Sequence, residues 1–152
     1  MARSGVSVDK ECNNAFQDLK LGKKFHYVIF KLDSDAKNIV VDKIGAKSSE
    51  EKASKMDSKE IYEEFIEHLP ETDCRYAIYD FQYVKSAEEG FRSKIVFIAW
   101  SPDESSVKSK MVYASSKEIL RTLFSGVGVE LQATALDEVD YASVLEKCNR
   151  GN

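Results

Sequence analysis

Residues 92–121 read RSKIVFIAWSPDESSVKSKMVYASSKEILR, and this stretch decides the fold. The nearly continuous apolar run over 93–100 is typical of an interior strand that is covered on both faces of its sheet. A polar turn and a long amphipathic helix follow, and a second, short strand is expected over 127–133. A strand, a long helix and a strand in this order predict a right-handed parallel crossover.

The long helix is expected to begin at Pro102 or Asp103 and to end before Gly126. At about 100° per residue, its apolar side chains fall within one sector of about 140°, which is wide enough to face a core. The residues in this sector are Val112, Tyr113, Ser116, Ile119, Leu120, Leu123 and Phe124. We therefore expect one side of the helix to pack against the sheet.

The other side of this helix presents Lys108, Lys110 and Met111. An exposed methionine on a solvated lysine face is ordinary, because isolated apolar residues are common on protein surfaces. The alternative is a docking surface, in which the lysines attract an acidic partner and the methionine adds apolar contact. Both interpretations stay open on the periodicity alone.

Three more strands are predicted over 25–32, 38–44 and 73–83 from their aromatic and β-branched content, with antiparallel pairing. A polar loop is expected over 85–90. These strands and the parallel crossover together predict a mixed sheet covered by helices.

Helical spacing predicts three further helices. The first follows Ser7 as its N-cap, and the second runs from a capping box at Asp57 and Glu60 to Pro70. The last carries its inner residues between 139 and 148. Residues 1–6 are expected to form a flexible tail and residues 46–59 a polar insertion loop.

Composition and charge narrow the class of protein. At 152 residues, 43% of them hydrophobic, the chain has the size and apolar content of a single domain spanning residues 1–152. The net charge of −4 argues against a nucleic-acid binder, which usually carries a basic excess. No apolar run approaches a membrane span, and no hydrophobic stretch follows Arg3 as in a secretory signal, so a cytoplasmic location is expected.

Cysteine and histidine do not form a recognisable site. Cys12, Cys74 and Cys148 are odd in number and widely spaced, which favours reduced, partly buried thiols over a disulfide framework or a zinc site. His26 and His68 have no partner at metal-ligand spacing. No metal is therefore expected.

No other motif predicts catalysis. The Gly126 and Gly128 pair lacks a third glycine and precedes a strand, so it is not a dinucleotide-binding loop. The acidic pairs at 63–64 and 88–89 lack the apolar surroundings that raise a carboxyl pKa. The residues therefore favour a small binding module without a cofactor or catalytic residues over an enzyme, and the long helix is its expected contact face.

Several long motifs resemble the actin-depolymerising factor/cofilin family over nearly the whole chain. The strongest are LPETDCRYAIYDFQY (69–83), RSKIVFIAWSPD (92–103) and KSKMVYASSKE (108–118), and shorter ones are SGV (4–6), LKLGKK (19–24) and VELQAT (129–134). The resemblance implies a single-domain α/β ADF-homology (gelsolin-like) fold, with a five-stranded mixed sheet flanked by helices on both faces. It also implies a monomeric protein that binds actin monomers, preferably with ADP, and filament sides, and that severs and depolymerises filaments.

The resemblance also assigns residues to two surfaces. The surface used for monomer and filament would comprise Ser4, Gly5, Val6, Lys108, Lys110, Met111, Ser115 and Glu138. A filament-only surface would comprise Arg92, Lys94, Glu146, Lys147 and Arg150. In the family, phosphorylation of the N-terminal serine switches the protein off. The resemblance therefore makes Ser4 the expected phosphorylation site of a phosphoprotein. Under the resemblance, Met111 belongs to an interface.

Two further expectations concern partners and location. The basic clusters are compatible with binding of phosphoinositides at the membrane surface, which would block actin. The 46–59 insertion mixes Lys and Glu without a basic block, so import into the nucleus by the family's basic signal is not expected. A coactosin-like protein, which binds filament sides without severing them, is the alternative within the fold.

Overall fold

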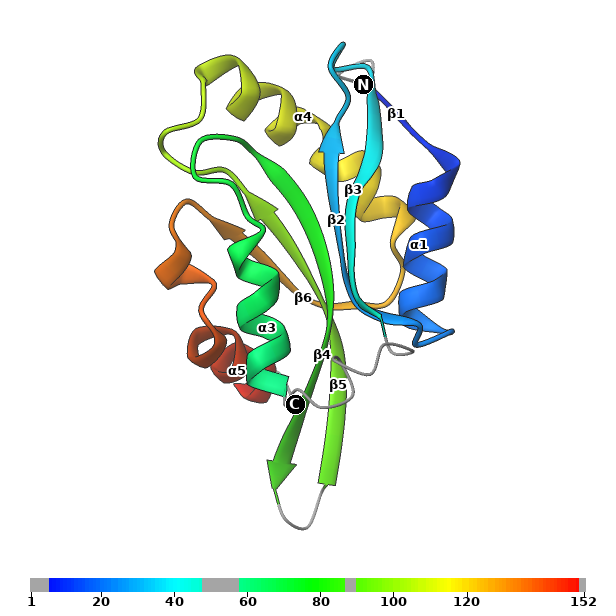
Figure 1. Ribbon diagram of the computed structural model, residues 1–152, viewed down its shortest axis with the longest axis vertical. Coiled ribbons are helices and arrows are strands. Elements are labelled where there is room, and N and C mark those ends of the chain that lie inside the picture. The colour runs from blue at the N-terminus through cyan, green and yellow to red at the C-terminus, as the bar shows by residue number, and fades with distance from the viewer. Residues whose placement is uncertain (1–5, 48–57, 87–89, 151–152) are drawn as a thin grey trace.

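The structure is a computed structural model that describes residues 6–47, 58–86 and 90–150. Figure 1 shows a twisted sheet with helices against both of its faces. In chain order the elements are β1 (Ser7–Val8), α1 (Lys10–Lys20), β2 (Phe25–Leu32), β3 (Asn38–Lys47), α3 (Ser58–Glu67), β4 (Arg75–Ser86), β5 (Gly90–Trp100), α4 (Val107–Leu123), β6 (Val127–Ala133), the 3-10 turn η1 (Leu136–Glu138) and α5 (Tyr141–Arg150).

The sheet has the order β1-β3-β2-β4-β5-β6. The β2–β3, β2–β4 and β4–β5 pairs are antiparallel, whereas β5 and β6 are parallel and α4 connects them. This arrangement confirms the predicted mixed sheet and the parallel crossover. The structure has one strand more than expected, because the short β1 pairs in parallel with the start of β3.

The two faces of the sheet form separate cores. Helices α3 and α5 cover one face, where Tyr62 and Val144 pack against sheet residues such as Tyr79. Helices α1 and α4 cover the other, where Phe16 of α1 stacks on Phe124 with 4.5 Å between ring centroids. Neighbouring residues of one strand serve opposite cores because their side chains alternate across the sheet. The expectation of helices on both faces is confirmed.

The N-terminal segment differs from the expected tail. Val6 is buried at 8% exposure in the α1–α4 core, so the prediction of a flexible tail is wrong at this residue. The Ser7 amide donates to the Lys37 carbonyl at 2.8 Å, which places Ser7 in a strand instead of at a helix N-cap. Asp9 is the N-cap instead, and its carboxylate accepts from the Glu11 amide at 2.9 Å. The expected tail residues 1–5 lie outside the described residues.

The other boundaries shift because long-range pairing outweighs local signals. Helix α4 begins at Val107 after the N-cap Ser106, not at Pro102 or Asp103, and Pro102 lies buried in the preceding loop. Strands β4 and β5 shorten the expected 85–90 loop, since their pairing continues to Ser86 and Gly90. Residues 46–47 complete β3 and 58–59 begin α3, which contradicts the ends of the predicted 46–59 loop; the part from 48 to 57, with Asp57 of the expected capping box, lies outside the described residues.

The buried thiols lead to a prediction about alkaline pH. Burial raises the pKa of Cys148 from 9.0 to about 11 and that of Cys12 to about 12. Because a raised pKa favours the neutral thiol, its contribution to stability is complete below pH 9 and is lost as the pH rises from 9 through the folded pKa values. Burial also raises the pKa of Tyr62.

We therefore expect the free energy of unfolding in urea to be level between pH 7 and 8 and to fall between about pH 9 and 11. Native Cys12 and Cys148, both 0% exposed, should also resist a thiol reagent such as DTNB at pH 8 and react once the chain is unfolded. Reaction of the native thiols at the rate of the unfolded chain would contradict this prediction.

Candidate functional site

The outer side of α4 forms the first candidate surface. Met111 is 66% exposed and Val107, one turn earlier, is 73% exposed, while Lys108 and Ser115 are also exposed. The opposite side of the helix carries the fully buried Leu120. The predicted orientation of Met111 is therefore confirmed. We call Val107, Lys108, Met111 and Ser115 the α4 surface.

Val107 was not predicted for this surface. It lies four residues before Met111, so the two side chains are neighbours on the helix and form an apolar strip beside Lys108. The i, i+4 spacing was visible in the sequence. Whether this spacing places Val107 on an exposed surface depends on where the helix begins. Val107 is expected inside the helix, whereas it is in fact the first helical residue.

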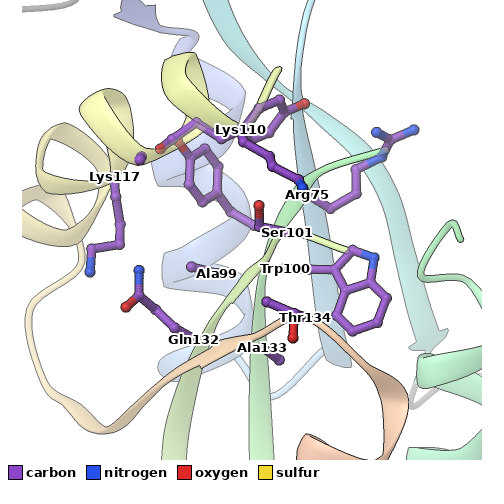
Figure 2. Close-up of a pocket in the computed structure, with 12 residues that line it drawn as sticks. Arg75, Ala99, Trp100, Ser101, Lys110, Lys117, Gln132, Ala133 and Thr134 are labelled. Carbon is purple, nitrogen blue, oxygen red and sulfur yellow. The ribbon is translucent and has the colours of Figure 1, made fainter. Parts of the chain in front are cut away.

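Lys110 has a different environment from Lys108. Its ammonium donates to the Asp103 carbonyl at 2.9 Å and therefore ties α4 to the loop that precedes it. Lys110 also lines a cavity of about 250 Å³ between α4 and the ends of β5 and β6. Figure 2 shows Lys110 and Lys117 on the helix side of this cavity, with Gln132 and Thr134 on the strand side. Lys110 thus holds a loop at the edge of the α4 surface.

Arg75 also lines this cavity, but its charge is already matched. Its Nε donates to Asp42 at 3.1 Å and one terminal nitrogen donates to Asp73 at 2.7 Å. Lys117 lies 3.9 Å from the Glu130 carboxylate, at the limit of an ion pair. Of these three cations, Arg75 and Lys117 therefore each have a carboxylate partner, whereas the Lys110 ammonium is bonded to a backbone carbonyl.

Glu138 supports the loop between β6 and α5. Its carboxylate accepts from the Thr134 amide at 2.9 Å, the Thr134 hydroxyl at 2.8 Å and the Ala135 amide at 3.1 Å. These hydrogen bonds, the Thr134 amide first, lower the pKa of Glu138. Thr134 lines the same cavity as Lys110. Glu138, which is hydrogen-bonded to Thr134, therefore lies near the ends of β5 and β6 that meet α4.

The N-terminal segment enters at the same end. Ser7 is bonded to Lys37, in the turn between β2 and β3. This turn and Lys108 both line a second cavity, of about 330 Å³. The structure therefore brings Val6 and the start of α4 to one end of the sheet. The predicted Ser4 and Gly5 lie outside the described residues.

The second candidate surface combines β5 and α5. Arg92 and Lys94 are two residues apart on one strand, so they point to the same face of the sheet, which α5 covers. The Lys94 ammonium donates to the Cys148 carbonyl of α5 at 2.8 Å. On α5, Arg150 donates to Glu146 at 2.5 Å, and Lys147 is exposed. We call Arg92, Lys94, Glu146, Lys147 and Arg150 the β5–α5 surface.

The two surfaces lie at different ends of the molecule. Lys94 is six residues before Trp100, which lines the cavity beside α4, and six strand residues span about 20 Å. Figure 1 shows the first half of α4 near one end of the sheet and α5 toward the other. The sequence-predicted residues thus form two groups on one sheet.

The described residues offer little for other kinds of site. In residues 6–47, 58–86 and 90–150, no group of three or more His, Cys, Asp or Glu side chains could hold a metal ion. Among the helices that the structure describes, none has the length and apolar content needed to cross a membrane. The three cysteines are free and buried.

Comparisons with known proteins give one consistent family. Residues 5–149 match the model of the family described as cofilin/tropomyosin-type actin-binding protein. The chain is 50% identical over 150 residues to a cofilin of Ogataea parapolymorpha, covering 99% of this chain and 96% of that protein. It is 49% identical to a cofilin of Saccharomyces cerevisiae, covering 99% and 97%. The solved structure of Streptomyces griseoflavus cofilin superimposes with a TM-score of 0.81 at 40% identity, covering 97% of this chain and 100% of that one.

Proposed function

Because this chain belongs to the family of cofilin/tropomyosin-type actin-binding proteins, we propose that it binds actin monomers and the sides of actin filaments. It prefers the ADP-bound monomer, and it severs and depolymerises filaments. It acts by binding, as a monomer and without a cofactor or covalent chemistry, in the cytoplasm at the actin cytoskeleton.

The separation of the two surfaces carries this proposal. Lys94 of the β5–α5 surface lies about 20 Å along β5 from Trp100, which lines the cavity beside α4, so we expect a single copy to contact two neighbouring actin subunits. A monomer needs only the α4 surface, together with the N-terminal segment and the loop that Glu138 supports. Filament binding uses both surfaces.

Severing follows from binding that depends on filament geometry. A rigid sheet presents both surfaces at a fixed distance, and it binds best to a filament whose subunits match that distance. Binding then shifts the filament population toward the matching twist, since a ligand favours the state for which it has the higher affinity. We expect a filament held in this altered twist to break more readily.

The α4 surface supplies both attraction and adhesion. Burial of an exposed Met or Val side chain contributes about 1.5–3 kcal/mol, and Met111 and Val107 are both available for it. Lys108 adds complementarity to an acidic partner and speeds association. Lys108 would also attract the anionic headgroups of phosphoinositides, which would then compete with actin for this surface.

The filament-only role of the β5–α5 surface is tested with Arg92→Ala combined with Lys147→Ala. Both side chains are exposed, so the fold should survive. We expect affinity for filaments to fall about tenfold or more in co-sedimentation, because two charge contacts to the second subunit are lost. Affinity for labelled ADP-actin monomers should stay within about twofold of the wild type.

The control variant removes two exposed lysines outside both surfaces, Lys24→Ala with Lys43→Ala, and should bind filaments normally. Equal loss of monomer and filament binding in the Arg92 and Lys147 variant would show that the two surfaces are not separate. A wild-type protein that co-sediments with filaments but does not accelerate pyrene-actin disassembly would be coactosin-like.

A further inference from the structure

One backbone carbonyl at the end of α5 receives two hydrogen bonds from the sheet. The Cys148 carbonyl accepts from the Lys94 ammonium at 2.8 Å and from the Tyr83 hydroxyl at 3.2 Å. Cys148 lies in the last turn of α5, where carbonyls have no partner within the helix. A cation there also interacts favourably with the helix dipole. The end of α5 is therefore tied to both β4 and β5.

The path of the Lys94 side chain is defined by Gly128 of β6. A Cβ atom added at Gly128 would lie 3.4 Å from each of the Cβ, Cγ and Cδ atoms of Lys94. The Lys94 stem thus crosses the β6 backbone where the chain has no side chain, and it is only partly exposed. Its ammonium is directed to α5.

The second donor cannot contact another protein. Tyr83 is 3% exposed and Cys148 is 0% exposed, so the hydroxyl and its acceptor lie inside the fold. Cys148 is flanked in the last turns of α5 by the surface residues Glu146, Lys147 and Arg150. A ten-residue helix is marginal in isolation, and its end depends on tertiary contacts.

We propose that Lys94 and Tyr83 are positioning residues, which fix the end of α5 and thereby orient Lys147 and Arg150 toward the filament. Lys94 acts through the Cys148 carbonyl and not as a direct contact with actin. This inference rests on the proposed filament binding, and it changes the role that the family resemblance implies for Lys94.

The first test compares Tyr83→Phe and Lys94→Met with Arg92→Ala. Hydrogen exchange of the actin-free proteins should show faster exchange in the last turn of α5 for Tyr83→Phe and Lys94→Met, and no change for Arg92→Ala. Filament affinity should fall about threefold to tenfold in Tyr83→Phe and Lys94→Met, with monomer affinity unchanged. Arg92→Ala should weaken filament binding without any change in exchange.

The second test leaves every charge in place. Gly128→Val puts a branched side chain in the path of the Lys94 stem, while valine itself suits a strand. It should reproduce the exchange and the filament affinity of Lys94→Met. Gly128→Ala is the matched control, because its Cβ would make ordinary contacts of 3.4 Å and leave Lys94 in place.

The outcomes separate the inference from the proposed function. If Tyr83→Phe and Gly128→Val bind filaments like the wild type while Lys94→Met does not, Lys94 contacts actin directly and the inference is overturned. Unchanged exchange in α5 of Tyr83→Phe and Lys94→Met would also overturn it, and this measurement needs no actin. Failure of the wild-type protein to co-sediment with filaments would instead contradict the proposed function.

Discussion

Replacement of Lys108 by Glu together with Met111 by Ala is expected to weaken binding to both actin monomers and filaments at least about a hundredfold. Met111 loses burial worth about 1.5–3 kcal/mol, and the charge reversal turns attraction to an acidic partner into repulsion. A loss of about 3 kcal/mol corresponds to a factor of a hundred in affinity. Monomer affinity from the fluorescence of labelled ADP-actin and filament co-sedimentation measure the effect.

The fold should be unaffected, because both side chains are exposed and surface changes of this kind usually alter stability by less than about 0.5 kcal/mol. Thermal unfolding followed by circular dichroism checks this. The matched control, Lys43→Glu with Leu21→Ala, reverses an exposed cation and shortens a 73% exposed apolar side chain elsewhere, and should bind actin normally. A variant at Lys108 and Met111 that binds normally would remove α4 from the interface.

Introduction of negative charge at Ser4 is expected to have a comparable effect. Ser4 stands two residues before Val6, which is buried, and three before Ser7, which is bonded to Lys37 at the end of the sheet where Lys108 lines a cavity. A phosphate would bring about −1.5 to −2 charges to this end at neutral pH. The phosphate would repel an acidic surface of actin, or it would bind lysines such as Lys108 and so compete with actin for them.

Ser4→Glu should therefore weaken monomer and filament binding about a hundredfold, at unchanged thermal stability. Ser4→Ala should remain active, because the alanine introduces no charge. Titration of labelled ADP-actin with both variants and with the wild type gives the comparison. Filament depolymerisation by Ser4→Glu at the wild-type rate would exclude a charge switch at this position.

The local periodicity of the sequence was sufficient for the orientation of α4. The 3.6-residue repeat placed Ser116, Leu120 and Phe124 inside and Met111 outside, and these four positions are as expected. Leu123 of the predicted apolar sector is the exception, since it is 38% exposed. Strand β6 also has its predicted bounds. These features depend on residues that are close in sequence, so spacing alone determines them.

Element ends were less predictable. Pro102 carries a helix-start signal, yet it is buried in a loop, and the helix starts after Ser106, whose hydroxyl accepts from the Ser109 amide at 3.1 Å. Ser7 carries an N-cap signal, yet its amide pairs with Lys37 in the sheet. In both cases the sequence offered two candidate positions, and partners distant in the chain selected one of them.

The sequence by itself determined the family, the mixed α/β sheet with helices on both faces and the outward face of α4, because these follow from residue patterns along the chain. Only the tertiary structure decided which groups each candidate residue contacts. Lys108 is exposed, whereas Lys110 and Glu138 hold loops and Lys94 holds the end of α5. The physical reason is that a long polar side chain bonds to whichever carbonyl or amide the fold brings within reach, and no spacing in the sequence specifies that partner.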